Sequence, residues 1–246
     1  MNNTPIIEIE KLVEAKITEK LKAYSAETTY TPFFSAIFDQ EVILKAALMQ
    51  SLYTSFGMSI YEQMAIILAK NAGYHAERQY QLLGEIDRDT AYLIDELCQQ
   101  PLSSKEQEIA AIRDSIKAGK PIKDKESTVD VFVKYPNGLE LYVDITTVKP
   151  NLKEFRSLRK KLLRWVALRL SIDKNAPLDT RIGIPYNPYS PQDYARWTGS
   201  ELSSHHLLVQ NQLWAAFAGY EVFDEIIEAF NRVGTRLKTS IKDSIR

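Results

Sequence analysis

Residues 128–147 read TVDVFVKYPNGLELYVDITT, and apolar side chains recur at every second position on either side of a short break. Such alternation is typical of β-strands, whose successive side chains point to opposite faces. The break, Pro136-Asn137-Gly138, suits a three-residue hairpin loop, because proline fits the first turn position and glycine accepts a positive φ. The stretch therefore predicts two antiparallel strands joined by a tight turn.

The register of this hairpin follows from the loop, which pairs Tyr135 with Leu139. One face then holds only apolar pairs, namely Val133–Leu141, Val131–Val143 and Val129–Ile145. The other face holds Lys134–Glu140, Phe132–Tyr142, Asp130–Asp144 and Thr128–Thr146. A slip by one residue would mix the two faces, so the pattern predicts a single register.

Two carboxylates, those of Asp130 and Asp144, are directly opposed in that register. Like charges at opposed positions repel each other, whereas the surrounding pairs are complementary. A divalent cation such as Mg²⁺ would turn the repulsion into coordination, because Mg²⁺ prefers oxygen ligands. The pattern indicates a metal site, and the alternative is an exposed acid pair relaxed by solvent. Without metal, we expect removal of either acid to leave stability unchanged or slightly higher.

The rest of the chain is mostly helical in pattern. In the first 120 residues we predict helices at 7–21, 41–52, 59–68, 77–97 and 105–118. Downstream we predict a helix at 151–170 with Asn151 as its N-cap, a strand at 180–186, and helices at 206–219 and 222–241. This order predicts an α/β fold with a small mixed β-sheet flanked by helices and a helical N-terminal region. We expect one domain over residues 1–246, with a helical part (1–120), a sheet and basic helix (121–190) and a C-terminal helical part (191–246).

The amino-acid composition excludes several classes of protein. The 246 residues carry a net charge of -1, which by itself indicates no nucleic-acid partner, but residues 120–170 hold twelve cations and six anions. Such a local basic surface can bind polyanions. The single cysteine, Cys98, excludes a disulfide scaffold and a cysteine zinc site. The sequence has no signal-peptide pattern and no apolar run of membrane-spanning length, which predicts a cytoplasmic protein without a membrane partner.

An acid on one strand, a second acid on the next strand and a basic helix after it resemble the PD-(D/E)xK nuclease fold. Longer segments resemble the TdeIII-type family of type II restriction endonucleases. These segments are SLYTSFGMSIYEQMA (51–65), ESTVDVFVKYPNGLELYVDITTVKPN (126–151), RIGIPYNPYSPQDYARW (181–197) and QLWAAFAGYEVFDEII (212–227). The likeness runs from about residue 35 to about residue 235, and its more specific parts are KPN and PYNPY. It implies a restriction-endonuclease-like fold and Mg²⁺-dependent DNA cleavage.

Position by position, the resemblance also implies roles for individual residues. Asp130 matches the first metal-binding acid, Asp144 the second, and Glu62 an additional helix glutamate that reaches the metal. The chain departs from the family pattern two residues after the second acid, where Thr146 stands in place of lysine. Lys149 is our candidate replacement, although strand parity places it on the other face. The departure is compatible with a working variant, with a weakened or inactive enzyme, or with an altered chain.

Two segments are predicted to bind DNA. The helix after the hairpin carries a basic stripe suited to phosphates, formed by Lys153, Arg156, Lys160 and Arg164. Its apolar stripe comprises Leu152, Phe155, Leu158, Leu162 and Trp165 or Val166. In the proline-rich loop that follows, Asn187, Tyr189 and Arg196 can contact bases or sugars. Both segments also allow a purely structural interpretation.

Together with these observations, the resemblance implies a type II restriction endonuclease that cleaves double-stranded DNA at a short palindrome, with Mg²⁺ as cofactor. A two-fold symmetric target favours a homodimer, and the resemblance implies a target of the GGNCC kind. The alternatives are another PD-(D/E)xK DNA nuclease, or a DNA-binding protein with a degenerate nuclease site.

Overall fold

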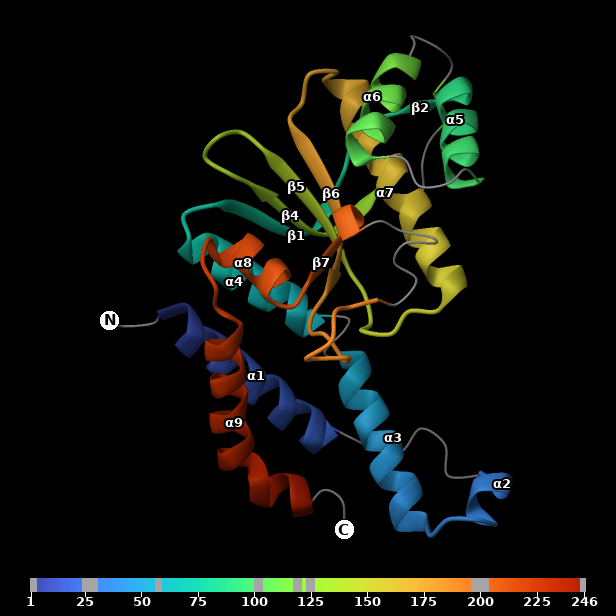
Figure 1. Ribbon diagram of the computed structural model, residues 1–246. Helices are drawn as coiled ribbons and strands as arrows, with labels where there is room; N and C mark the ends of the chain where they lie inside the picture. Colours follow the sequence, from blue (N-terminus) through green and yellow to red (C-terminus); the bar gives the residue numbers. More distant parts are fainter. Residues whose placement is uncertain are drawn as a thin grey trace. The chain divides into compact units, whose positions relative to one another are not determined.

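A computed structural model describes residues 4–23, 31–55, 59–99, 104–116, 121–122, 127–195 and 204–243 of the chain (Figure 1). The chain divides into two compact units, one comprising residues 1–67 and 222–246 and the other residues 68–221. The single domain expected from the sequence stays a prediction, and each unit is described by itself below.

The second unit is built on a five-stranded sheet with strand order β1-β4-β5-β6-β7. Its strands are β1 (His75–Gln81), β4 (Thr128–Lys134), β5 (Glu140–Ile145), β6 (Leu178–Ile184) and β7 (Leu207–Val209). β1, β4 and β5 pair antiparallel, whereas β5, β6 and β7 pair parallel. The predicted fold class, a small mixed sheet flanked by helices, is therefore confirmed.

The β4–β5 hairpin has the register that the sequence predicts. Its ladder consists of the pairs Val131–Val143, Phe132–Tyr142, Val133–Leu141 and Lys134–Glu140. In the loop, the Gly138 amide donates to the Tyr135 carbonyl (2.9 Å), and Gly138 has a φ of +87°. The positive φ is the reason that glycine suits this position. The ladder ends at Val131–Val143, so the three outer predicted pairs, including Asp130–Asp144, are not part of it.

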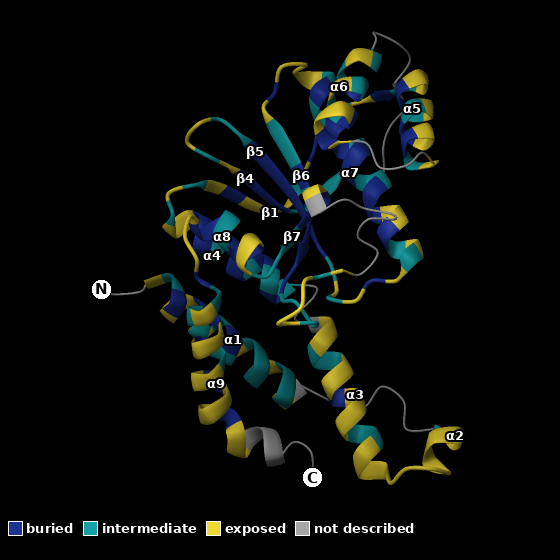
Figure 2. Ribbon diagram, in the orientation of Figure 1, coloured by how far each residue is buried: buried dark blue, intermediate teal, exposed yellow. Residues whose placement is uncertain are grey.

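Helices cover both faces of this sheet, as Figure 1 shows. On one face, Phe132 and Tyr142 share a core with Phe155 and Leu162 of α7 (Leu152–Ile172). On the other face, α8 (Asn211–Ala218) approaches Gly183 of β6 through Leu213. Every residue of β5 is consequently buried (Figure 2). The face that mixes polar and aromatic residues in the sequence is thus the face that α7 covers.

α7 begins where the sequence predicts. The Asn151 side chain accepts a hydrogen bond from the Glu154 amide (2.9 Å), which satisfies one of the donors left open at a helix start. The predicted apolar residues Phe155, Leu158 and Leu162 are buried, and so are both Trp165 and Val166; Leu152 is half-buried. α7 packs against β6 and against α5 (Arg88–Gln99) and α6 (Lys105–Ser115). Short strands β2 (Ile86–Asp87) and β3 (Pro121–Ile122) pair with each other beside it.

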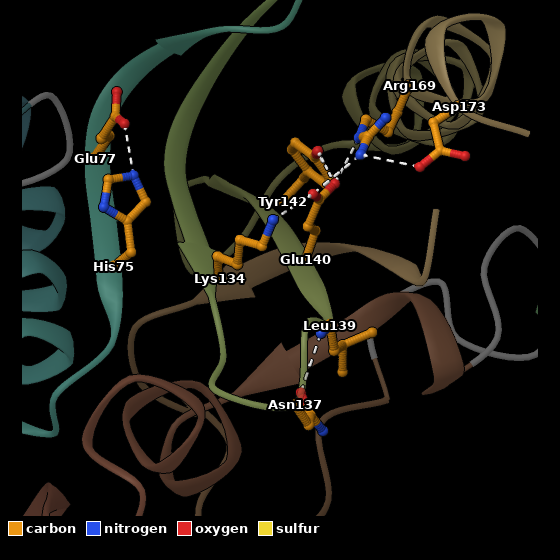
Figure 3. A network of polar contacts seen from close by, with 9 residues as sticks. All are labelled: His75, Glu77, Lys134, Asn137, Leu139, Glu140, Tyr142, Arg169 and Asp173. Carbon is orange, nitrogen blue, oxygen red and sulfur yellow. Dashed lines mark hydrogen bonds and ion pairs between the residues drawn. The ribbon is translucent and has the colours of Figure 1, made fainter. Parts of the chain in front are cut away.

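A buried ion pair fixes α7 to the hairpin. The Arg169 guanidinium donates to both Glu140 carboxylate oxygens (2.6 and 3.1 Å), and the Tyr142 hydroxyl adds a third hydrogen bond (2.8 Å) (Figure 3). Burial alone would raise the pKa of Glu140, but these hydrogen bonds outweigh it and hold the pKa below its usual value. The predicted Lys134–Glu140 ion pair is also present, with 3.5 Å between the Lys134 ammonium and Oε1 of Glu140. It is weaker than the Arg169–Glu140 pair, because Lys134 is exposed.

The first unit is helical in its described residues. It holds α1 (Thr4–Ala23), α2 (Pro32–Ser35), α3 (Gln40–Ser55) and α9 (Phe223–Asp243), together with the start of α4 (Tyr61–Asn71), which ends in the second unit. α1 packs along α9. Arg236 of α9 donates to Glu10 (2.6 Å) and Glu14 (2.7 Å) of α1, so charges reinforce this contact.

Two sequence predictions are wrong. Residues 77–97 do not form one helix, because β1, β2 and only then α5 occupy this stretch. β1 lies at the edge of the sheet, where only Ala76 is buried, and its polar, helix-favouring side chains hide the strand. The helix expected from residue 206 begins at Asn211, because β7 precedes it. The other predicted helices and the strand at 180–186 are present with shifts of a few residues at their described ends.

Candidate active site

The two acids of the hairpin lie where the β4–β5 ladder ends. The backbone amide of Ile145 donates to Oδ2 of Asp130 at 2.9 Å, so a side chain takes over where a backbone carbonyl would otherwise pair. β5 nevertheless continues beside β6, through the pairs Asp144–Ile182 and Ile145–Gly183. The end of the ladder thus brings the Asp130 carboxylate to the residue that follows Asp144.

The opposite neighbour of Asp130 is also irregular. β1 pairs with β4 on both sides of Asp130, through Arg78–Val131 and Tyr80–Val129. In this register the residue facing Asp130 is Gln79, whose φ is +48°. A positive φ is uncommon for a residue other than glycine, and such conformations gather at functional sites. Asp130 therefore lies beside backbone irregularities on both neighbouring strands.

Asp144 is buried and engages a cation from α7. Its side chain is 8% exposed and forms an ion pair through Oδ2 with the Lys161 ammonium. Because Asp144 pairs with Ile182 and neighbouring residues of paired strands share a face, Asp144 points to the α7 side of the sheet. Lys161 is partly exposed and lies over the Trp165 ring, 5.1 Å from its centroid.

The residues proposed for the missing lysine have other partners. The Thr146 hydroxyl donates to Oε1 of Glu154, in the first turn of α7, at 3.0 Å. The Lys149 ammonium lies 5.6 Å from the centroid of the Tyr189 ring, as a cation–π contact. Lys149 is exposed, in agreement with the strand parity that places it away from Asp144. Its hypothesised role at the cleavage site stays a prediction without a supporting contact.

Glu62 lies on α4, in the first unit, and is buried with 3% exposure. Its expected role as a third metal ligand stays a prediction. Over the ranges that the structure describes, no three histidine, cysteine, aspartate or glutamate side chains gather where they could hold a metal ion. Within the second unit, the Asp130 carboxylate contacts the amide of Ile145, the residue that follows Asp144.

The basic stripe of α7 is only partly open to solvent. Lys153 and Arg156 are exposed, whereas Arg164 and Lys160 are half-buried. Lys160 forms an ion pair with Asp95 of α5 at 2.7 Å. These four cations remain candidates for phosphate contacts, and Lys160 already contacts an acid.

A different α7 cation, Arg159, is buried in a polar cluster. It donates to Glu108 of α6 at 2.6 Å, and His206 contacts the other Glu108 oxygen at 3.0 Å. Burial would raise the pKa of Glu108, but the hydrogen bonds from His206 and Arg159 outweigh it and lower the pKa. All three side chains are buried, so the cluster joins α6, α7 and the residue before β7 in the interior.

The proline-rich loop after β6 is held by its own polar groups. The Asn187 side chain donates to the Gln192 carbonyl (2.7 Å) and accepts from the Tyr189 amide (3.0 Å). The Tyr194 hydroxyl donates to the Val148 carbonyl (3.0 Å), which ties the loop to the segment after β5. A cavity of about 400 Å³ opens beside Asn187 and Tyr194. Arg196 lies outside the described residues.

The comparison with protein families gives a match over most of the chain. A sequence model described as "Type II restriction endonuclease, HinfI" matches residues 1–234.

The chain belongs to the HinfI family of type II restriction endonucleases.

As a member of the HinfI family, the chain is a site-specific deoxyribonuclease, a hydrolase that acts on double-stranded DNA in a restriction–modification system. Type II restriction endonucleases generally use Mg²⁺. The expected type II family is thereby confirmed, and the narrower TdeIII-type resemblance is not. A comparison with curated protein sequences gives no match. Among the helices in the described ranges, none is long and apolar enough to cross a membrane.

Sequence reasoning did not place Lys161 beside Asp144, where the structure has it. The signal that could have found it is its position on α7, seven residues after Glu154 and four before Trp165. Residues at these spacings share a helix face. Lys161 is therefore a cation aligned with an inward-facing tryptophan, on the side of α7 that meets the sheet.

Proposed function

We propose that this HinfI-family enzyme hydrolyses DNA with Mg²⁺ held by Asp130 and Asp144, at a short palindromic site. The observation that carries the proposal is the contact of Asp130 with the Ile145 amide, which brings both acids to the end of one strand ladder. The additional helix glutamate that the resemblance implies is Glu62 of α4.

The chemistry of the donor set fits Mg²⁺. Two carboxylates offer oxygen ligands, and Mg²⁺ is often held by one or two carboxylates. The Asp144 carboxylate is buried, so solvent screens its attraction to a bound cation less than it would at the surface. Both observations support a divalent cation at the two acids.

Hydrolysis requires that water attack phosphorus, that one phosphorus–oxygen ester bond break, and that the departing alcohol oxygen receive a proton. Bound Mg²⁺ would acidify the attacking water and neutralise charge on the phosphate. Solvent water can give the proton to the departing oxygen, and Asp130 and Asp144 would hold the metal ion on the sheet. α7 contributes positive charge from the same side, since Lys161 contacts Asp144.

DNA would be held by two elements of the second unit. The α7 cations Lys153, Arg156, Lys160 and Arg164 are suited to phosphates, which give affinity without sequence preference. The loop residues Asn187, Tyr189 and Arg196 are the proposed base or sugar contacts. Asn187 and Tyr189 lie in the segment that the Tyr194 hydroxyl ties to Val148, after β5. A short palindrome then calls for two copies of the chain.

The proposed homodimer has a candidate surface in the first unit. α2 and α3, with the turn between them, expose large apolar side chains: Phe33, Phe34, Ile37, Phe38, Val42, Met49 and Tyr53. Phe33 is 85% and Ile37 73% exposed. Exposed apolar patches of this kind mark protein–protein contacts. We propose that a second copy of the chain covers them. We also place the enzyme in the cytoplasm, where a restriction endonuclease meets DNA.

Digestion of a plasmid of known sequence tests the function. We expect discrete fragments with Mg²⁺, none with EDTA, and none with Asp144→Asn. Asp114→Asn, which changes an exposed aspartate of α6, is the matched control and should cut normally. Mapping the fragment ends gives the target, and ends within GGNCC would support the finer TdeIII-type prediction. Random degradation, or cleavage that survives Asp144→Asn, would overturn the proposal.

A further inference from the structure

The end of the hairpin lacks the charge that its family pattern provides. A lysine two residues after the second acid would share the strand face of Asp144, but this position is Thr146. Its hydroxyl is directed to Glu154 of α7 at 3.0 Å. Thr146 therefore ties the end of β5 to the start of α7 and brings no positive charge.

A positive charge nevertheless reaches Asp144, from a different element. The Lys161 ammonium forms an ion pair with Oδ2 of Asp144, whose side chain is 8% exposed. The Lys161 side chain is 25% exposed, so it connects the buried carboxylate with the surface. Its place over the Trp165 ring, 5.1 Å from the centroid, orients it along α7.

The neighbouring cations have different partners. Lys149 lies over the Tyr189 ring, Lys160 pairs with Asp95, and Arg159 is buried against Glu108. In none of these three contacts is the cation directed to Asp130 or Asp144. Among the contacts described here, Lys161 is the α7 cation that reaches Asp144.

We propose that Lys161 supplies, from α7, the positive charge that the family pattern places on the strand, and that Thr146 is therefore a tolerated replacement. This inference rests on the proposed function, since it assigns a role in DNA cleavage. Lys161 acts in two ways. It orients the Asp144 carboxylate, and its ammonium stabilises the negative charge that builds up on the attacked phosphate.

The test compares Lys161→Met with the wild type and with Lys149→Met and Lys160→Met, which remove matched charges. We expect Lys161→Met to lower the single-turnover cleavage rate about 100- to 1,000-fold at saturating Mg²⁺. Lys149→Met tests the competing assignment of this role to Lys149, whose ammonium lies over the Tyr189 ring, and it should lower that rate less than Lys161→Met does. Lys160→Met should affect DNA affinity more than the single-turnover rate.

Two further measurements separate this role from a structural one. Calorimetry with Ca²⁺ alone should show tighter binding to Lys161→Met than to the wild type, because a competing cation has left Asp144. DNA binding in Ca²⁺ should change by less than about three-fold. If Lys161→Met does not fold, Lys161→Arg keeps the charge and should retain cleavage within about ten-fold. The double variant Thr146→Lys/Lys161→Met should regain at least ten-fold over Lys161→Met.

The outcomes distinguish this inference from the proposed function. If wild type cuts and Lys161→Met cuts equally fast, the inference is wrong and the function stands. The inference is also wrong if Lys149→Met loses cleavage while Lys161→Met keeps it. A wild type that binds DNA without cutting, and that cuts only as Thr146→Lys, would show that Lys161 does not replace the strand lysine. If no variant cuts any DNA, the proposed function itself fails.

Discussion

The amide of Ile145 donates a hydrogen bond to the Asp130 carboxylate across 2.9 Å, between two strands whose ladder has already ended. This contact changes how the two acids are interpreted. From the sequence alone, Asp130 and Asp144 are two like charges that repel each other in an otherwise complementary hairpin. In the structure each acid has a partner of its own, the Ile145 amide for Asp130 and Lys161 for Asp144.

The first prediction concerns these partners. Asp130→Ala should abolish cleavage and lower the free energy of unfolding by about 1–3 kcal/mol, because the buried Ile145 amide loses its acceptor. Asp144→Ala should also destabilise, since Lys161 loses its carboxylate. Both expectations reverse the one drawn from charge repulsion alone. Urea unfolding in EDTA measures the effect, and equal or higher stability of both variants would restore the repulsion argument.

The second prediction concerns the contact between β5 and α7. Glu140→Gln should lower the free energy of unfolding by about 3 kcal/mol, because it leaves the Arg169 guanidinium without its carboxylate in a largely buried position. Lys134→Ala is the control. It removes an exposed partner of the same Glu140 and should cost less than about 1 kcal/mol.

A double-mutant cycle completes this second test. Glu140→Gln combined with Arg169→Met should be less destabilising than the two single changes added together, because each leaves the other partner unpaired. Strict additivity of the two free energies would mean that the pair contributes little to the attachment of α7.

The third prediction concerns the phosphate contacts of α7. Lys160→Ala should weaken DNA binding by a similar factor for all sequences and reduce the salt slope by about one. Asp95→Asn removes the acid that Lys160 contacts at 2.7 Å, so it should strengthen binding. Titrations at several salt concentrations check both signs. A change of preferred sequence in Lys160→Ala would instead place this residue at the bases.

The fourth prediction concerns pH. Lys105 is buried beside Asp179, and burial lowers the pKa of Lys105 to about 8, against the pull of that carboxylate. Between this value and the ordinary lysine pKa, the unfolded chain holds a proton that the folded chain has released. Stability should therefore rise with pH from about 8 to about 10, by at most about 3 kcal/mol. Lys105→Met should remove this rise, and an unchanged slope in the variant would assign it to other groups.

The sequence contains the information for the hairpin, because alternation and the Pro136-Asn137-Gly138 loop together allow one register. It also contains the start of α7, because Asn151 is followed by an amphipathic pattern. β1 is hidden, since an edge strand needs few buried side chains and Glu77, Arg78 and Gln79 resemble a helix. Local pattern therefore predicts elements that bury one face, and it fails where burial is shallow.

In the candidate site, too, some residues can be predicted from local pattern and others depend on packing. Asp130 and Asp144 could be predicted, because both belong to one hairpin and strand pairing relates them. Lys161 could not be assigned to them, since seventeen positions separate it from Asp144 and only the packing of α7 on β5 joins them. The partners of Thr146 and Lys149 likewise depend on where α7 and the loop after β6 lie.

The edge position of β1 has a consequence for behaviour at high protein concentration. An edge strand can recruit a strand of another molecule and so begin aggregation. β1 carries Glu77 and Arg78, and the positive φ of Gln79 interrupts the regular extended backbone that a recruited strand would need. The irregularity beside Asp130 should therefore also help the folded enzyme to resist fibril formation when it is overproduced.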